Sequence, residues 1–173
     1  MQTGLRTFVH ETRSFRGLSA GAIEEAGTLL HQAERAFLIV ADAHLVEARP
    51  TYGRFVGGER GVFVPGAEHP TSIDVGRLTI TSRRVVLAGL WERREWPFSN
   101  LVAVHHDPDA PWTALPLSSQ ERVSGFLYPA GEVHLVRFRL MLALAVHTGT
   151  VGQLRIQLQT ALDEHSAQQP PLP

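Results

Sequence analysis

The chain has 173 residues, a formal net charge of −1 and no cysteine. This length suits one domain with an adequate apolar core, and the missing cysteine excludes disulfides, thiolate nucleophiles and cysteine-ligated zinc or iron–sulfur centres. The near-neutral charge disfavours a nucleic-acid partner. We find no apolar leader at the start of the chain and no run near the roughly 20 residues of a membrane helix, so a cytoplasmic protein is expected.

The N-terminal part predicts a loose lead-in followed by a helix. Residues 1–17 are polar and show no hydrophobic period. Ser19 is a suitable N-cap for a helix that runs to about residue 33, because small and aliphatic residues then recur at helical spacing. These residues are Ala22, Ala26, Leu29, Leu30 and Ala33. One domain is expected over 18–165, with residues 166–173 as a disordered, proline-rich tail.

Between Phe37 and Tyr128 the sequence reads as a series of short strands. "TYGRFVGGERGVFVPG" (51–66) has the pattern of a hairpin, because Gly57-Gly58 tolerates the positive φ of tight turns. "GRLTITSRRVVLAGL" (76–90) alternates apolar and polar residues on either side of a polar break at Ser82-Arg83. The regular, short spacing predicts an antiparallel barrel or sandwich.

Two helical segments are expected near the C-terminus. Residues 131–149 are densely apolar and indicate either one buried helix or a strand that runs into a helix. After Gly149, the pair Thr150 and Gln153 has the capping-box pattern at the start of a further helix. Its apolar stripe consists of Val151, Leu154, Leu158, Ala161 and Leu162. Sheet and helices together predict an α+β fold.

"DVGRLTITSRRVVLAG" followed by "ERREWPF" resembles the bacterial pleckstrin-homology-like (GRAM-like) domains that are common in actinobacterial proteins of unknown function. The matching positions are Asp74, Gly76, Thr81, Arg84, Gly89, Glu95, Trp96 and Phe98. The resemblance covers roughly 37–165, and Leu87 stands where an aromatic residue is usual. It implies a PH-like, partly open barrel of seven antiparallel strands with helices packed on it. Trp96 and Phe98 would then fill the barrel, and Arg84 would lie across the sheet or pair with Glu95.

Arginines at predicted turns are the first candidates for a binding site. Arg60, Arg83, Arg93 and Arg94 could converge at one rim of the barrel and grip a phosphate. The competing interpretation is that they are solvated turn residues offset by nearby acids. All 16 basic residues of the chain are arginine, and the missing lysine disfavours a lipid site. Trp91, beside a turn, is the best candidate for an exposed aromatic side chain.

Metal, nucleotide and catalytic sites find little support. In "HHDPD", His105 and His106 would point to opposite faces of a strand, so a strand that ends in an Asp-Pro turn is the better interpretation. "GGERG" (57–61) lacks the Lys-Ser/Thr of a phosphate-binding loop. There is no G-x-S-x-G motif and no cysteine nucleophile. We therefore expect a protein that is not an enzyme and needs no metal or cofactor.

The expected function is a non-enzymatic interaction module. It would bind a protein partner, or a second copy of itself, at the barrel rim or at an exposed sheet edge. Arg60, Arg83, Arg93, Arg94 and Trp91 are the residues expected to form this surface. One alternative is peripheral binding to anionic lipid headgroups through the arginine-bearing turns. Another is a small-molecule pocket, or an unrecognised hydrolase site, inside the curved sheet.

Overall fold

The computed structural model describes residues 12, 17–18, 30–50, 54–56, 62–64 and 68–167. The main sheet contains β1 (Ala36–Pro50), β4 (Glu68–Thr81), β5 (Arg84–Gly89), β6 (Arg93–Pro97), β7 (His105–His106), β8 (Trp112–Ala114) and β9 (Ser124–Leu127). A separate pair consists of β2 (Arg54–Val56) and β3 (Val62–Val64). The helices are α3 (Val133–Thr148) and α4 (Val151–Ala167), with 3-10 turns η2 (Phe98–Asn100) and η3 (Ala130–Glu132).

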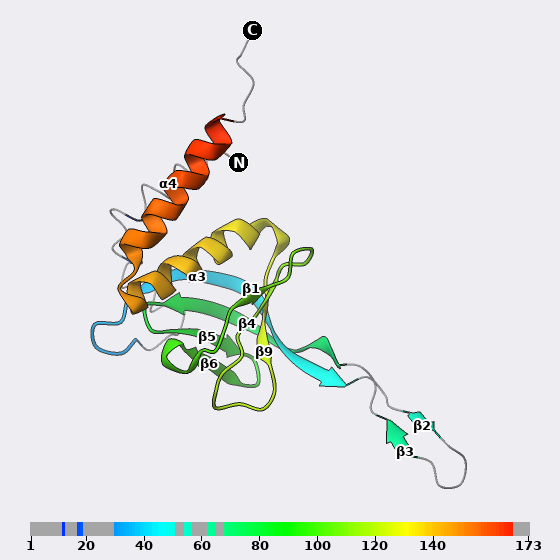
Figure 1. The fold of residues 1–173 in the computed structure, drawn as a ribbon. Coiled ribbons are helices and arrows are strands. Elements are labelled where there is room, and N and C mark those ends of the chain that lie inside the picture. The colour runs from blue at the N-terminus through cyan, green and yellow to red at the C-terminus, as the bar shows by residue number, and fades with distance from the viewer. Residues whose placement is uncertain are drawn as a thin grey trace.

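The seven strands of the main sheet are antiparallel and lie in the order β6-β5-β4-β1-β9-β8-β7. The sheet is open, because β6 and β7 lie at its two edges. The expected α+β class and the seven antiparallel strands are therefore confirmed. The hairpin predicted over 51–66 is also confirmed where β2 pairs with β3, beyond the long β1–β4 hairpin (Figure 1).

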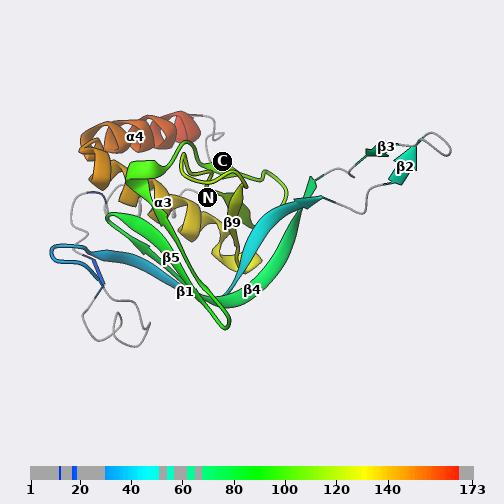
Figure 2. The same ribbon diagram turned by 90° about the horizontal axis from the view of Figure 1, so that it is seen from below.

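The sheet curls strongly, as Figure 2 shows for β1 and β4. The pairing of β1 with β4 shifts register at three places, and Asp42 in the second of them has a positive φ of 54°. Such bulges bend a strand and increase its twist. Two side-chain contacts cross the curled interior from β6. Arg94 pairs with Glu47 of β1, and the indole Nε1 of Trp96 donates to Ser124 Oγ of β9 at 3.0 Å.

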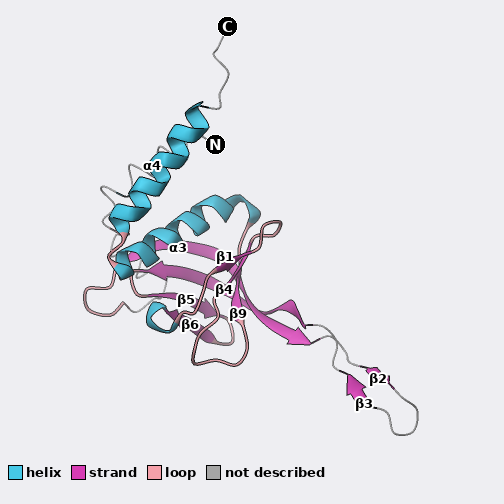
Figure 3. Ribbon diagram, viewed as in Figure 1, coloured by secondary structure: helices cyan, strands magenta, loops and turns pink. Residues whose placement is uncertain are grey.

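Aromatic side chains fill the interior of this curled sheet. Trp96 is 0% exposed, and its ring lies 5.8 Å from that of Phe126, which in turn lies 5.8 Å from Tyr128. Phe98 is buried as well. The expectation that Trp96 and Phe98 belong to the core is confirmed. α3 lies over one side of the sheet (Figure 3), and its buried residues, among them Leu140, belong to the same core.

The segment expected to be either a helix or a strand is helical throughout α3. Gly149 ends it in the left-handed conformation at φ 72°, the usual role of glycine after a helix. Figure 1 shows α3 lying over the sheet and α4 leaving its end at an angle. Along α4 only Leu154 and Leu158 are buried, and Ala161 is exposed, so the predicted stripe contacts the domain along its first half.

Several sequence expectations concern the ends of the chain. The helix from Ser19 lies outside the described residues apart from its last few positions, where 30–33 are not helical. Most of the lead-in over 1–17 also lies outside them. α4 continues to Ala167, and residues 168–173, the greater part of the predicted tail, lie outside the described residues. No helix in the described ranges is long and apolar enough to cross a bilayer.

Candidate interaction surface

The turn between β5 and β6 exposes two large apolar side chains to solvent. Leu90 is 74% exposed and Trp91 is 88% exposed. The expectation of an exposed aromatic at Trp91 is confirmed. Scattered apolar residues are normal on a protein surface, but a neighbouring pair that includes a tryptophan is a common feature of interaction sites.

The carboxylate of Asp74 holds this turn in place. Its Oδ1 accepts the backbone N–H of Val75 at 2.8 Å and of Leu90 at 3.2 Å, and its Oδ2 accepts those of Trp91 and Glu92 at 3.0 Å each. Burial alone would raise the pKa of Asp74, but these donors outweigh it and lower the pKa below its ordinary value. The turn is therefore fixed by three hydrogen bonds from Leu90, Trp91 and Glu92, while the bond from Val75 orients the carboxylate.

Two glycines allow the strands to approach closely enough for this arrangement. A Cβ atom at Gly89 would lie 2.1 Å from Asp74 Oδ2, and one at Gly76 would lie 2.0 Å from the carbonyl oxygen of Ala88. Neither position has space for a side chain. The sequence marks Asp74, Gly76 and Gly89 as motif residues, but their shared role in one turn becomes visible only in the paired strands.

Beside this turn, β6 presents an edge of the sheet. The backbone N–H of Gly89 donates to the carbonyl of Glu92, and that of Phe98 donates to the carbonyl of Arg83. Hydrogen-bonded pairs occur at every second position between these two bonds, which makes Arg94 and Trp96 the residues of β6 whose backbone groups bond to β5. Antiparallel pairing alternates, and the backbone groups of the intervening residues therefore point away from β5. Strand edges of this kind can accept a further strand.

The arginines of β6 are already paired with carboxylates. Arg93 Nε lies 2.8 Å from Glu95 Oε1, and Arg94 Nη2 lies 2.7 Å from Glu47 Oε1 and 2.8 Å from Glu92 Oε1. Burial alone would lower the pKa of Arg94, but these two carboxylates raise it. Both guanidinium groups thus lie in local ion pairs.

The structure does not bring Arg83 together with Arg93 and Arg94. Arg83 lies in the β4–β5 turn, at the opposite end of β5 from Trp91, and a strand of that length spans about 20 Å. Arg93 and Arg94 lie at the Trp91 end, on successive positions of β6. Arg60 lies outside the described residues. The geometry therefore gives no support to a common phosphate site formed by Arg83 and the arginines of β6.

Arg84 is the buried arginine of this region and its role is structural. It contacts Glu95 at 2.6 Å, as the resemblance implied, and Glu34 at 3.1 Å, a partner that sequence reasoning missed. Thr81 Oγ1 also donates to Glu34 at 2.6 Å. Burial would raise the pKa of Glu34, but the hydrogen bonds from Thr81 and His31 N–H and the charge of Arg84 lower it.

The "HHDPD" segment forms a strand end and a turn, as expected. His105 is exposed, whereas His106 packs against Thr113 with Nδ1 2.9 Å from Oγ1. Asp107 Oδ1 accepts the backbone N–H groups of Asp109 and Ala110 at 2.9 and 2.8 Å. Across the described ranges, no three His, Asp or Glu side chains gather closely enough to hold a metal ion.

Comparison with known proteins gives no assignment, because no protein-family model matches the chain and no curated protein is significantly similar to it. The likeness to GRAM-like domains therefore depends on the motif residues themselves and on where the fold places them.

Proposed function

We propose that the chain is a PH-like, GRAM-like domain. Seven antiparallel strands followed by a helix on the sheet support this assignment. The eight motif residues support it further, because they form three clusters in space, each with its own structural role. Asp74, Gly76 and Gly89 build the β5–β6 turn, Thr81, Arg84 and Glu95 join in the buried ion-pair network, and Trp96 and Phe98 lie in the core.

Its proposed function is that of a non-enzymatic interaction module. It binds a protein segment, from a partner or from a second copy, through the Leu90–Trp91 turn and the adjoining edge of β6. The observation that carries this proposal is the 88% exposed indole of Trp91 on a turn fixed by Asp74. A rigid, preformed anchor loses little conformational entropy on binding, and tryptophan is enriched among the residues that dominate binding energy.

A comparison of two exposed apolar residues tests this function. The purified domain, Trp91→Ala and Ile156→Ala are each immobilised and exposed to lysate, and light scattering after gel filtration measures their oligomeric state. Ile156 is 65% exposed on α4 and serves as the matched control. We expect a retained protein or a dimer for the wild type and for Ile156→Ala, and loss of that species for Trp91→Ala. A monomer that retains nothing, or an equal result for both variants, contradicts the proposal.

A further inference from the structure

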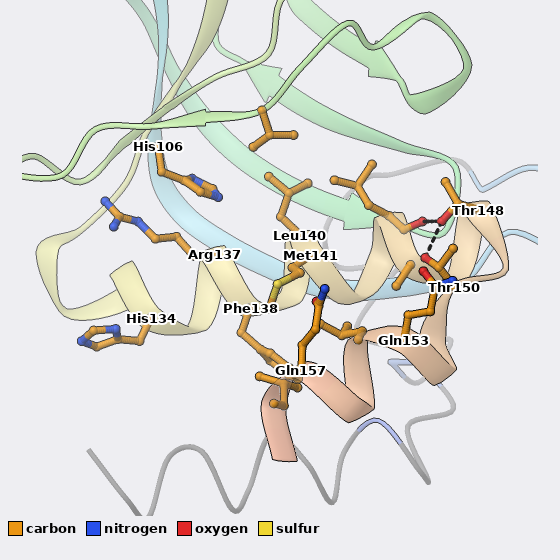
Figure 4. Close-up of a pocket in the computed structure, with 15 residues that line it drawn as sticks. His106, His134, Arg137, Phe138, Leu140, Met141, Thr148, Thr150, Gln153 and Gln157 are labelled. Carbon is orange, nitrogen blue, oxygen red and sulfur yellow. Dashed lines mark hydrogen bonds between the residues drawn. The ribbon is translucent and has the colours of Figure 1, made fainter. Parts of the chain in front are cut away.

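A second surface, separate from the Trp91 turn, lies between α3, α4 and the segment around β7. It is a groove of about 580 Å³, a volume within the range of roughly 300–1,000 Å³ that small-molecule sites occupy. Figure 4 shows its lining from both helices. The middle is apolar, with Phe138, Leu154 and Leu158 from the core side and Met141, 40% exposed, toward solvent.

One end of this groove carries the charge of Arg137. His106 and His134 line the same end in Figure 4, from β7 and from α3. Burial, and after it the charge of Arg137, lowers the pKa of His106, so Arg137 makes this end basic. The opposite end is polar and neutral, with Thr148 and Gln153. The groove therefore combines an apolar channel with a single basic end.

The guanidinium of Arg137 has neutral hydrogen-bond acceptors. Its Nη2 donates to the carbonyl oxygens of Asp107 and, at 3.4 Å, of Ala110, and its Nε donates to Tyr128 Oη at 3.4 Å. In contrast to the arginines of β6, Arg137 forms no ion pair with a carboxylate of the described residues, and its hydrogen bonds to them come from Nε and Nη2. These bonds fix the guanidinium in place while one amino group stays available.

Asp107 is an acidic residue whose charge interacts with that of Arg137, and both of its carboxylate oxygens already accept hydrogen bonds. Its Oδ1 accepts the N–H groups of Asp109 and Ala110, and its Oδ2 accepts Trp112 Nε1 at 3.2 Å. The two backbone donors, and after them Trp112 and Arg137, lower the pKa of Asp107 despite burial. Asp107 therefore shapes the turn and attracts Arg137, so the charge of the guanidinium at the groove end is partly offset.

We infer that this groove binds an amphipathic monocarboxylate with an unbranched acyl chain. The carboxylate contacts Arg137, and the chain lies along Phe138, Met141 and Leu154. From Arg137 to Thr148 the helix rises about 16 Å, which is comparable with an extended medium-length acyl chain. One available amino group suits a monoanion, whereas a phosphate dianion would call for a second cationic partner.

Titration calorimetry with laurate tests the apolar part of the site. The probe is added to the wild type, to Met141→Glu and to Ile156→Glu. Both variants place a carboxylate at an exposed position of a helix, but only Met141 lines the groove. We expect Met141→Glu to weaken laurate binding about tenfold or more, through lost apolar contact and like-charge repulsion, and Ile156→Glu to change it less than about twofold.

A second arm tests the basic end of the groove. Dodecyltrimethylammonium has a similar chain and the opposite charge, so the wild type should bind laurate at least about tenfold more tightly. In Arg137→Gln this preference should disappear, with folding checked by circular dichroism. The inference is overturned if laurate does not bind, if Met141→Glu and Ile156→Glu behave alike, or if the wild type binds the cation as tightly as the anion. The two wild-type titrations decide the charge preference even if Arg137→Gln fails to fold.

Discussion

At the scale of single residues, Asp74 has the largest influence on the proposed interaction surface. Its carboxylate accepts hydrogen bonds from three backbone N–H groups of the turn and thereby fixes the direction in which Trp91 leaves the sheet. Hydrogen bonds to an ionised acceptor are stronger than those between neutral groups. The charge on Asp74 is therefore part of the structure of the turn.

We predict that Asp74→Asn lowers the midpoint of thermal unfolding at neutral pH. Because the folded pKa of Asp74 is depressed, its stabilising contribution is complete above the unfolded value of about 3.9 and is lost as the pH falls through the folded value. The difference between wild type and variant should therefore shrink in acid. Circular dichroism melts at several pH values measure this, with the exposed Asp163→Asn on α4 as control. A difference that stays constant down to strongly acidic pH would contradict the assignment.

At the scale of elements, the segment before β1 is tied to β5 and β6 by charge. Glu34, fully buried, meets Arg84 of β5, which in turn meets Glu95 of β6, and Arg93 joins at the exposed end. Three parts of the chain thus share one network. Removal of one member of a buried pair leaves its partner charged and uncompensated.

The inner and outer members of this network should differ in their effect on stability. We predict that Arg84→Met costs about 3–5 kcal/mol of the free energy of unfolding, because Glu34 loses its counter-charge in the interior. Arg93→Met, at the exposed end, should cost about 0–1 kcal/mol. Urea denaturation of both variants measures the two values. Equal losses in the free energy of unfolding would contradict the prediction that the buried ion pair of Arg84 contributes more to stability than the exposed one of Arg93.

At the scale of the whole molecule, the sheet is open in its backbone but linked across its interior by side chains. Trp96 reaches Ser124 of β9, and Arg94 reaches Glu47 of β1, so the edge strand β6 is held against the opposite half of the sheet. The interior is filled by aromatic rings. Stability should depend on this filling and hardly at all on the exposed turn.

Substitutions of two tryptophans compare the contribution of the interior to stability with that of the exposed turn. Trp96→Ala removes a fully buried ring that touches Phe126, and we predict a loss of about 3–5 kcal/mol in the free energy of unfolding. Trp91→Ala removes an exposed ring and should change the same quantity by less than about 0.5 kcal/mol. Chemical denaturation of both proteins provides the measurement. A large loss for Trp91→Ala would show that the turn is part of the core structure and is not a separate surface.

Much of this fold could be predicted from local patterns. The alternation around Leu78 and Ile80 reflects a sheet with one apolar face, and both residues are buried as that pattern requires. The pairing of Arg84 with Glu95 followed from the motif, since both belong to neighbouring strands. Exposure of Trp91 followed from its place beside a turn.

Other features depend on the tertiary arrangement and have no local signal. Glu34 lies 50 positions before Arg84, so only the completed fold brings them together. Convergence of Arg83 with Arg93 could have been rejected from the sequence alone, because the strand between the two turns separates them. The basic end of the α3–α4 groove joins Arg137 of a helix to His106 of a distant strand, which no spacing rule predicts.

The contrasting positions of the indoles have a practical consequence for spectroscopy. Emission from Trp91 comes from a ring in water, whereas emission from Trp96 comes from a ring sealed among Phe126 and its neighbours. Binding at the turn would alter the emission of Trp91, which lies at longer wavelength and is accessible to quenchers, and would leave the shorter-wavelength emission of Trp96 unchanged. Unfolding would instead shift the emission of Trp96 to longer wavelength. The chain has a third, half-buried tryptophan, Trp112. With Trp112 replaced by phenylalanine, two intrinsic reporters remain, and fluorescence can distinguish recognition from denaturation without an added label.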